Sequence, residues 1–361
     1  MSNRRRVGII GATGMVGQRF VTLLANHPWF EVAALAASPR SAGKTYKEAI
    51  GPRWAMSEPI PDRIKGMTVL DASDVESVSS LVEFVFCAVD MPKDQIRALE
   101  EAYARAETPV ISNNSANRMT PDVPMIIPEI NPQHMEIIPA QRKRLGTHTG
   151  FIAVKPNCSI QSYVPALSAL ADLKPSRAVV STYQAISGAG KTFARWPEML
   201  DNVIPYIGGE EEKSEQEPLK IWGGIEEGSI VPAKLPVISA QCVRVAVTDG
   251  HLATCWVDFE KPATQEEIIE RWRSFSGMPQ QLHLPSAPVP FMQYFEENDR
   301  PQTRLDRDFG GGMAISLGRQ RGSSLFQWRF VGLSHNTLRG AAGGGVLIAE
   351  LLCECGYIPS K

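Results

Sequence analysis

The chain has 361 residues, of which 43% are hydrophobic and 21% charged, and its formal net charge is −2 at pH 7. This length favours two domains, and the near-neutral charge argues against nucleic-acid binding, which needs a basic surface. No apolar run is long enough to span a bilayer, so we expect a cytoplasmic protein with neither a membrane nor a nucleic-acid partner.

A glycine-rich turn follows the first predicted strand. Residues 7–10 form a short apolar run, the turn Gly11-Ala-Thr-Gly-Met-Val-Gly17 comes next, and apolar residues then recur with helical periodicity. A strand, a glycine turn and a helix in this order are typical of a dinucleotide site, where the pyrophosphate binds at the helix N-terminus. The spacing is G-x-x-G-x-x-G rather than the commoner G-x-G-x-x-G. The cofactor residues predicted here are Gly11, Thr13, Gly14, Met15 and Val16.

The end of the second predicted strand, residues 31–37, indicates which dinucleotide binds. An acidic residue there would bind the ribose 2′-hydroxyl of NAD, but the chain continues with Ser38, Pro39, Arg40 and Ser41. Hydroxyl and cationic side chains suit a 2′-phosphate, so Ser38, Arg40 and Ser41 predict NADP. The alternative is an exposed basic turn.

Two further predicted strands, residues 84–89 and 110–115, belong to the same sheet. Ligands of an open parallel sheet lie beyond the carboxyl ends of its strands, so Cys87 and Asn114 are expected to border the cofactor. For Cys87, a role as a small buried filler is an equal alternative.

Cys158 is the candidate nucleophile. The six cysteines show no zinc-type spacing, so we expect reduced thiols and no bound metal. Helical periodicity starts after Pro156, which places Cys158 at the start of a helix, where the helix dipole would lower the thiol pKa. Cysteines at helix starts are also often structural.

Polar residues that suit acyl chemistry follow further along the chain. A strand ending at Gln184 leads into a glycine turn that contains Gly188, and a strand-like run from Cys242 carries Arg244 and His251. Arginine offers a fork for a carboxylate, and histidine moves protons near neutral pH. Predicted strands at 177–185, 242–247, 253–259, 312–317 and 324–331 indicate a mixed sheet with one covered face.

The apolar helix predicted at 338–352 suits burial against the first domain, which would then be discontinuous. Gly310–Gly312 and Gly343–Gly345 are interpreted as chain punctuation, and the second triplet permits close helix packing.

Taken together, these blocks resemble those of the aspartate-semialdehyde dehydrogenase family, in the family's order and over nearly the whole chain. The resemblance is closest to the archaeal and fungal branch. The matching blocks are the Gly11–Gly17 turn, Pro156-Asn-Cys158, Gln184 with Ser187-Gly-Ala-Gly190, Glu210-Glu-Glu-Lys213, Arg244 with His251, and Ser334-His-Asn336-Thr-Leu-Arg-Gly.

The resemblance implies a Rossmann-type NADP-binding domain of residues 1–156 and 335–361, and an α+β catalytic and dimerisation domain of residues 157–334. It also implies a homodimer or homotetramer that uses NADPH to convert β-aspartyl phosphate to aspartate β-semialdehyde and phosphate. Its implied catalytic residues are Cys158, which forms a thioester, His251, which moves the proton, and Gln184, which holds the acyl oxygen.

The resemblance also assigns the binding residues. Arg244 would bind the substrate carboxylate, Glu210 its ammonium group, and Lys213 and Arg118 the phosphate. Asn114 joins the substrate set, and Gly188 and Asn336 contact the cofactor. Without the resemblance, the Glu210–Lys213 segment would be interpreted as a solvated acidic loop.

Three other functions stay open. N-acetyl-γ-glutamyl-phosphate reductase and malonyl-CoA reductase share the thioester chemistry. The substrate of the first has an acylated amine and needs no acid at Glu210, and the substrate of the second carries CoA and needs a wider cavity entrance. A regulator that senses NADP without turnover would not need Cys158, Gln184, Arg244 and His251 together.

Overall fold

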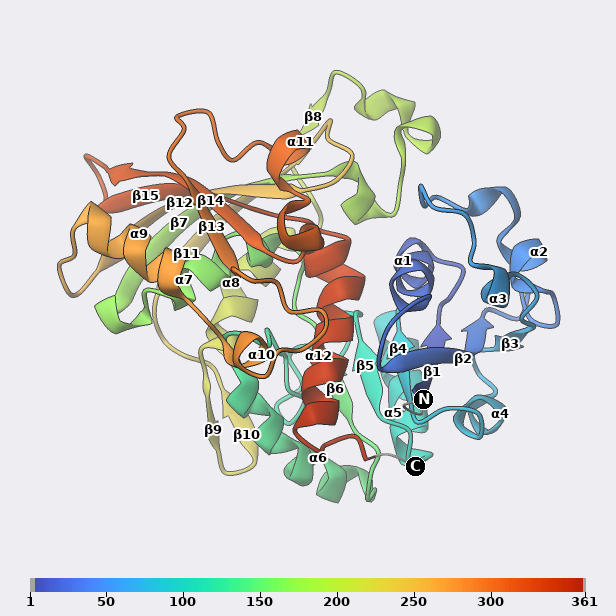
Figure 1. Ribbon diagram of the computed structural model, residues 1–361. Helices are drawn as coiled ribbons and strands as arrows, with labels where there is room; N and C mark the ends of the chain where they lie inside the picture. Colours follow the sequence, from blue (N-terminus) through green and yellow to red (C-terminus); the bar gives the residue numbers. More distant parts are fainter. Residues whose placement is uncertain (1–3, 360–361) are drawn as a thin grey trace.

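The computed structural model describes residues 4–359, which fold around two β-sheets with helix α12 (Gly343–Glu354) running between them (Figure 1). The first sheet has six parallel strands in the order β3-β2-β1-β4-β5-β6. Their bounds are β1 Arg5–Ile10, β2 Phe30–Ala37, β3 Val69–Asp71, β4 Phe84–Cys87, β5 Val110–Ser112 and β6 Ile152–Val154. The predicted open parallel sheet is confirmed.

Helices cover both faces of this sheet because its strands are apolar on both sides. On one face, Val7 and Ile9 of β1 share a buried cluster with α1 (Met15–Leu24) and α12. On the other face, Ile10 shares a cluster with α5 (Lys93–Arg105) and α6 (Ile138–Leu145). Helix α12 contacts both β5 and α1, so the C-terminal part of the chain completes the layer of helices on the first of these two faces.

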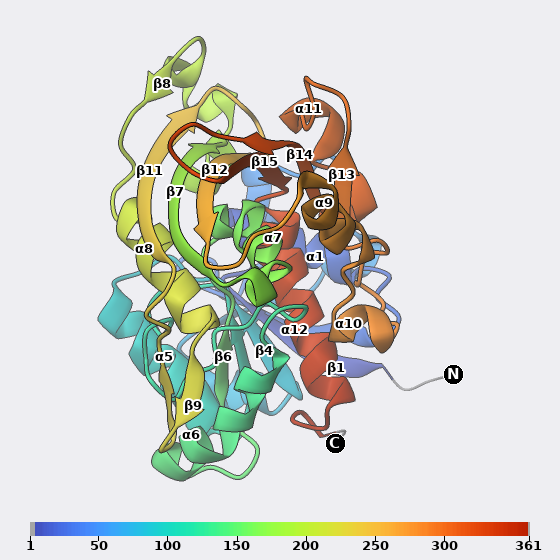
Figure 2. The same cartoon turned by 90° about the vertical axis from the view of Figure 1, so that its left-hand side faces the viewer.

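The second sheet is mixed and has seven strands in the order β13-β14-β15-β12-β7-β11-β8. Figure 2 shows β11, β7 and β12 side by side. The bounds are β7 Pro175–Gln184, β8 Val203–Ile204, β11 Val237–Val245, β12 His251–Phe259, β13 Met292–Phe295, β14 Ile315–Gly322 and β15 Trp328–Ser334. Helices α7 (Val164–Ser168), α8 (Glu210–Ile221) and α9 (Gln265–Ser274) lie on its inner face. The predicted mixed sheet with one covered face is therefore confirmed.

The remaining elements are short. They are helices α2 Tyr46–Ile50, α3 Asp62–Lys65, α4 Val75–Ser79, α10 Met278–Gln281 and α11 Thr303–Asp306, and the hairpin of β9 Gly224–Glu226 and β10 Ser229–Val231. No helix within residues 4–359 is long and apolar enough to cross a membrane.

The strands predicted at 242–247 and 253–259 correspond to β11 and β12, and Gly250, with a φ of +98°, lies in the loop that separates them. Two other predicted elements differ from the structure. No α-helix starts at Cys158, which precedes the four-residue 3₁₀ turn Ser159–Ser162. The helix expected from Leu338 starts with a wide π-helical segment that kinks at Ala341, and α12 itself begins at Gly343.

Candidate active site

A cavity of about 440 Å³ is lined by residues of both halves of the chain. Its wall includes the predicted site residues Met15, Val16, Asn114, Arg118, Cys158, Gly188, Glu210, Lys213 and Asn336. Gln184, Arg244 and His251 are buried behind this wall, as their contacts below show. The structure therefore gathers side chains that the sequence spreads over more than three hundred positions.

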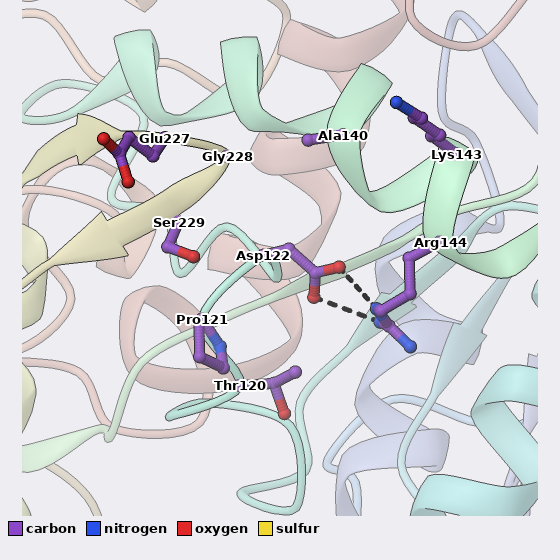
Figure 3. Close-up of a pocket in the computed structure, with 9 residues that line it drawn as sticks. All are labelled: Thr120, Pro121, Asp122, Ala140, Lys143, Arg144, Glu227, Gly228 and Ser229. Atoms are coloured by element: carbon purple, nitrogen blue, oxygen red, sulfur yellow. Dashed lines mark hydrogen bonds and ion pairs between the residues drawn. The ribbon is translucent and has the colours of Figure 1, made fainter.

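A larger cavity of about 730 Å³ lies elsewhere, between α6 and the β9–β10 turn (Figure 3). No thiol or imidazole lines it, and its Arg144 is paired with Asp122 at 3.1 Å. The groups capable of acyl chemistry are in the smaller cavity.

The glycine turn is shaped for a dinucleotide. Gly11 has a φ of +89°, and a side chain on it would collide with the Ala88 carbonyl, while a side chain on Gly17 would collide with the Gly11 carbonyl. Gly14 is the N-cap of α1 and offers no side-chain cap, so the first backbone N–H groups stay free for a phosphate. Met15 and Val16 in this first turn line the cavity. These features fit the pyrophosphate of NADP.

The turn after β2 carries the residues predicted to recognise the 2′-phosphate. Ala37, which ends β2, is buried, whereas Ser38 and Arg40 are exposed and Ser41 is buried. No acidic residue occurs in the turn from Ser38 to Ser41, so the turn is compatible with an anionic group.

Cys158 lies against the π-helical segment, and a methyl group on Gly340 would come within 2.8 Å of its Cβ. Burial raises the pKa of the Cys158 thiol, and the Glu210 carboxylate adds to this effect, while Lys155, Arg118 and Arg244 oppose it. The expectation that a helix start lowers this pKa is wrong, because a 3₁₀ turn of four residues provides too little dipole to offset burial.

Glu210 is the first residue of α8 and is buried, so the interpretation of this residue as part of a solvated loop is wrong. Its carboxylate accepts hydrogen bonds from Asn157 Nδ2 at 3.0 Å, Gln184 Nε2 at 3.1 Å and Lys213 Nζ at 2.7 Å. Burial alone would raise the Glu210 pKa, but the charge of Lys213 and these hydrogen bonds hold it below its usual value. Glu210 is thus a buried anion at the cavity wall.

Arg244 and His251 both contact the loop that follows β7. Arg244 Nη1 donates to the Ala185 carbonyl at 2.8 Å, and the Ala185 N–H donates to His251 Nδ1 at 3.0 Å. A methyl group on Gly188 would lie 2.9 Å from Arg244 Nη1 and 3.0 Å from His251 Nε2, so glycine lets both side chains reach the loop.

His251 is held as a neutral ring. Burial, and after it the charge of Arg244, lower the pKa of His251 to about 3. Because Nδ1 accepts a hydrogen bond, the neutral ring carries its hydrogen on Nε2, which is buried without a partner. Glu210 and Arg244 each act electrostatically on both His251 and Cys158, which places the imidazole and the thiol in one cluster.

The other predicted residues have defined partners. Asn336 accepts the Gly250 N–H and donates to Ser187 Oγ, both at 2.8 Å, and so fixes the loop before His251. Arg118 donates to Glu217 Oε1 at 2.9 Å and to the carbonyls of Lys155 and Asn113.

Cys87 is not brought to the cavity wall. It is fully buried under Asn114, whose Nδ2 donates to the Cys87 sulfur at 3.4 Å and to Glu100 Oε1 at 3.1 Å. Burial, followed by the charge of Glu100, raises the Cys87 pKa well above its usual value, which leaves the thiol protonated.

Three residues of the site were missed from the sequence. Asn157 holds Glu210, Glu217 accepts the Asn157 N–H at 2.6 Å, and Lys155 is buried near Cys158. The spacing of Glu210, Ser214 and Glu217 is the i, i+4, i+7 pattern of a buried helix face and could have revealed Glu217. The described cysteines are all free, and residues 4–359 contain no cluster suited to a metal ion.

Comparison with protein families gives two matches. Residues 6–138 match the family model described as the NAD binding domain of semialdehyde dehydrogenase, and residues 167–339 match the model of its dimerisation domain.

Relatives match along their whole length. The chain is 43% identical over 351 residues to the aspartate-semialdehyde dehydrogenase of Methanothermobacter thermautotrophicus, covering 96% of this chain and 99% of that protein. It is 41% identical over 364 residues to the enzyme of the same name from Aspergillus fumigatus, covering 98% and 99%. The crystal structure of aspartate semialdehyde dehydrogenase with NADP from Candida albicans superposes with a TM-score of 0.89 at 38% identity, over 99% of this chain and 100% of that one.

Proposed function

The chain belongs to the semialdehyde dehydrogenase family, and from this premise we propose that it is an NADP-dependent aspartate-semialdehyde dehydrogenase. The reaction is the conversion of β-aspartyl phosphate and NADPH to aspartate β-semialdehyde, phosphate and NADP. The observation that carries the proposal is the convergence of a thiol, a buried carboxylate and a buried arginine at one cavity next to the glycine turn.

Cys158 is the nucleophile. Its thiolate attacks the acyl carbon, a C–S bond forms, the bond from carbon to the phosphate oxygen breaks, and phosphate leaves. The Gly11–Gly17 turn and the Ser38–Ser41 turn would hold NADPH, which when bound would supply a hydride to the acyl carbon of the thioester. The C–S bond then breaks, which releases the aldehyde and returns the Cys158 thiolate. His251 moves the proton: burial favours its neutral ring, whose hydrogen on Nε2 is donated to the acyl oxygen as negative charge develops there.

Charged side chains recognise the two ends of the substrate. Arg244 uses one nitrogen on Ala185 and offers the rest of its fork to the α-carboxylate. The substrate ammonium group replaces Lys213 as the ion-pair partner of Glu210. Lys213 is then free to bind the phosphate together with Arg118. Both cations line the same cavity, as this exchange requires.

The described features of the site do not favour either of the following rival functions. An N-acetylated substrate carries no ammonium group, so it would leave the buried Glu210 carboxylate without a partner. A regulator that binds NADP without turnover has no need for the arrangement around Cys158.

The test is NADP reduction with aspartate β-semialdehyde and phosphate, comparing the wild type with Cys158→Ala and Glu210→Gln. We expect Cys158→Ala to lose activity by at least a thousandfold and Glu210→Gln to raise KM for the semialdehyde with a smaller change in kcat. Wild-type activity of Cys158→Ala would end the thioester mechanism, and unchanged kinetics of Glu210→Gln would favour a rival substrate.

The assembly and the domain division belong to the same proposal. The match to a dimerisation domain indicates an oligomer, and we assign a homodimer or homotetramer that uses the open face of the second sheet, where Val179, Tyr183 and Val237 are 39%, 37% and 64% exposed. The contacts of α12 support an NADP-binding domain of residues 1–156 and 335–361 and a catalytic domain of residues 157–334. The cytoplasm is the compartment proposed.

A further inference from the structure

Lys155 is a buried cation that the mechanism above does not use. It follows β6 directly and is 2% exposed. Its Nζ donates to the Pro156 carbonyl at 2.6 Å, so the side chain folds along the turn that leads to Cys158. The backbone of Lys155 is fixed on both sides, because its N–H donates to the Ser112 carbonyl and its own carbonyl accepts from Arg118.

Two glycines locate the end of the lysine relative to the thiol. A methyl group on Gly340 would lie 2.8 Å from Cys158 Cβ, and one on Gly344 would lie 3.1 Å from Lys155 Cε. The two glycines are four positions apart at the corner where the π-helical segment becomes α12. Lys155 Cε and Cys158 Cβ therefore both lie against this corner.

The other cations near Cys158 have partners of their own. Arg118 is paired with Glu217, and Arg244 donates to the Ala185 carbonyl. The thiol also faces Glu210, whose charge disfavours a thiolate.

The charged groups that act electrostatically on Lys155 are Cys158, Arg118, Arg339 and Glu217. Arg339 is paired with Glu129, and Glu217 is already bound by Arg118. Among the ion pairs of residues 4–359, Lys155 has no carboxylate partner, so its charge is available to the thiol.

We propose that Lys155 is a positioning residue whose ammonium group provides the countercharge of the Cys158 thiolate. The inference depends on the proposed function only in taking Cys158 as the nucleophile.

The energetics of burial make the two charges depend on each other. A thiolate or an ammonium group buried alone is costly, but the cost falls when both form together. Burial lowers the pKa of Lys155 to about 7, while the charge of Cys158 acts in the opposite direction. The two groups therefore titrate as a coupled pair, and removal of the lysine makes the thiolate harder to form.

The experiment measures alkylation of Cys158 by iodoacetamide between pH 5 and pH 10, with the labelled peptide quantified by mass spectrometry. It needs neither substrate nor cofactor, so its failure is distinct from failure of the proposed function. We expect Lys155→Met to raise the apparent thiol pKa by about one unit, which slows alkylation at pH 7 about tenfold. Lys155→Arg should recover part of the difference because it keeps the charge.

Lys93→Met is the matched control, because Lys93 lines the same cavity but is exposed, where solvent screens its charge. This variant should leave the alkylation midpoint of Cys158 unchanged. The exposed Cys355 serves as the internal reference thiol, whose alkylation midpoint should be the same in every variant. Folding is checked by circular dichroism and thermal unfolding. A folded Lys155→Met protein with the wild-type alkylation midpoint overturns the proposal.

A reciprocal measurement covers the case in which Lys155→Met does not fold. Cys158→Ala keeps the Cβ that packs on Gly340, so this variant should fold. In protein labelled with ¹³Cε-lysine, with the Lys155 signal assigned through Lys155→Arg, the titration midpoint of Lys155 should be lower in Cys158→Ala than in the wild type. Equal midpoints overturn the proposal.

Discussion

Gly340→Ala should inactivate the enzyme with only a moderate loss of stability. The added methyl group would lie 2.8 Å from Cys158 Cβ and 3.3 Å from its Cα. Carbon atoms in contact are about 3.5–4.0 Å apart, so the cysteine or the corner must move by about 1 Å. Overpacking of this kind costs about 1–3 kcal/mol of stability, and a displacement of about 1 Å at a nucleophile can reduce the rate about 100-fold.

The assay is kcat/KM for semialdehyde oxidation, together with the free energy of unfolding from urea titration. Gly224→Ala is the control, because Gly224 has no atom within 4 Å of the added methyl group and lies in the exposed strand β9. We expect the control to match the wild type in both measurements. Wild-type kcat/KM in folded Gly340→Ala would refute the idea that this contact fixes the position of the sulfur.

Two further predictions concern the cofactor and the buried histidine. Arg40→Ala should raise KM for NADPH by about 10- to 100-fold, because it removes one or two charge-assisted hydrogen bonds, and should leave KM for NADH nearly unchanged. An equal rise in KM for both cofactors would contradict a contact between Arg40 and the 2′-phosphate. Burial, and after it the charge of Arg244, lower the pKa of His251 to about 3, whereas its value in the unfolded chain is about 6.5. Between these two pH values the unfolded chain binds one more proton than the folded chain, so a fall in pH destabilises the fold. His251→Asn should therefore reduce the pH dependence of the unfolding free energy between pH 6.5 and pH 4.5 by up to about 1.4 kcal/mol per pH unit, as measured by urea titration, and an unchanged slope would show that His251 is protonated in the native state.

Local features were predictable from the sequence. The first strand, the glycine turn and helix α1 are contiguous, and each is specified by its own residues: an apolar run, glycines at close approaches, and helical periodicity. The absence of an acid after β2 is local for the same reason.

Properties set by tertiary contacts were not predictable in this way. The start of α8 has three consecutive glutamates and looks like a solvated segment, but Glu210 alone is drawn inward by Asn157, Gln184 and Lys213, which come from other parts of the chain or the next turn. The thiol pKa depends on burial by segments far from Cys158, which a pattern around the cysteine does not contain.

The way in which Arg244 and His251 meet was not predictable from the sequence either. The run from Cys242 to His251 has strand-like residues at both ends, and the reversal depends on the backbone of Gly250. Because β7 lies between the two strands in the sheet, Arg244 and His251 meet across the Ala185 backbone rather than along one strand.

The position of α12 between the two sheets has a consequence for biosynthesis. Asn336, Gly340 and Ala341 complete the cavity wall, and α12 supports the corner behind Cys158, yet this stretch is translated after every strand of both sheets. Domains tend to fold in the order of synthesis, so a nascent chain can form its sheets while the nucleophile still lacks its backing. Catalytic competence should therefore appear as a late event on the ribosome, only after α12 has been synthesised and has packed against the first sheet.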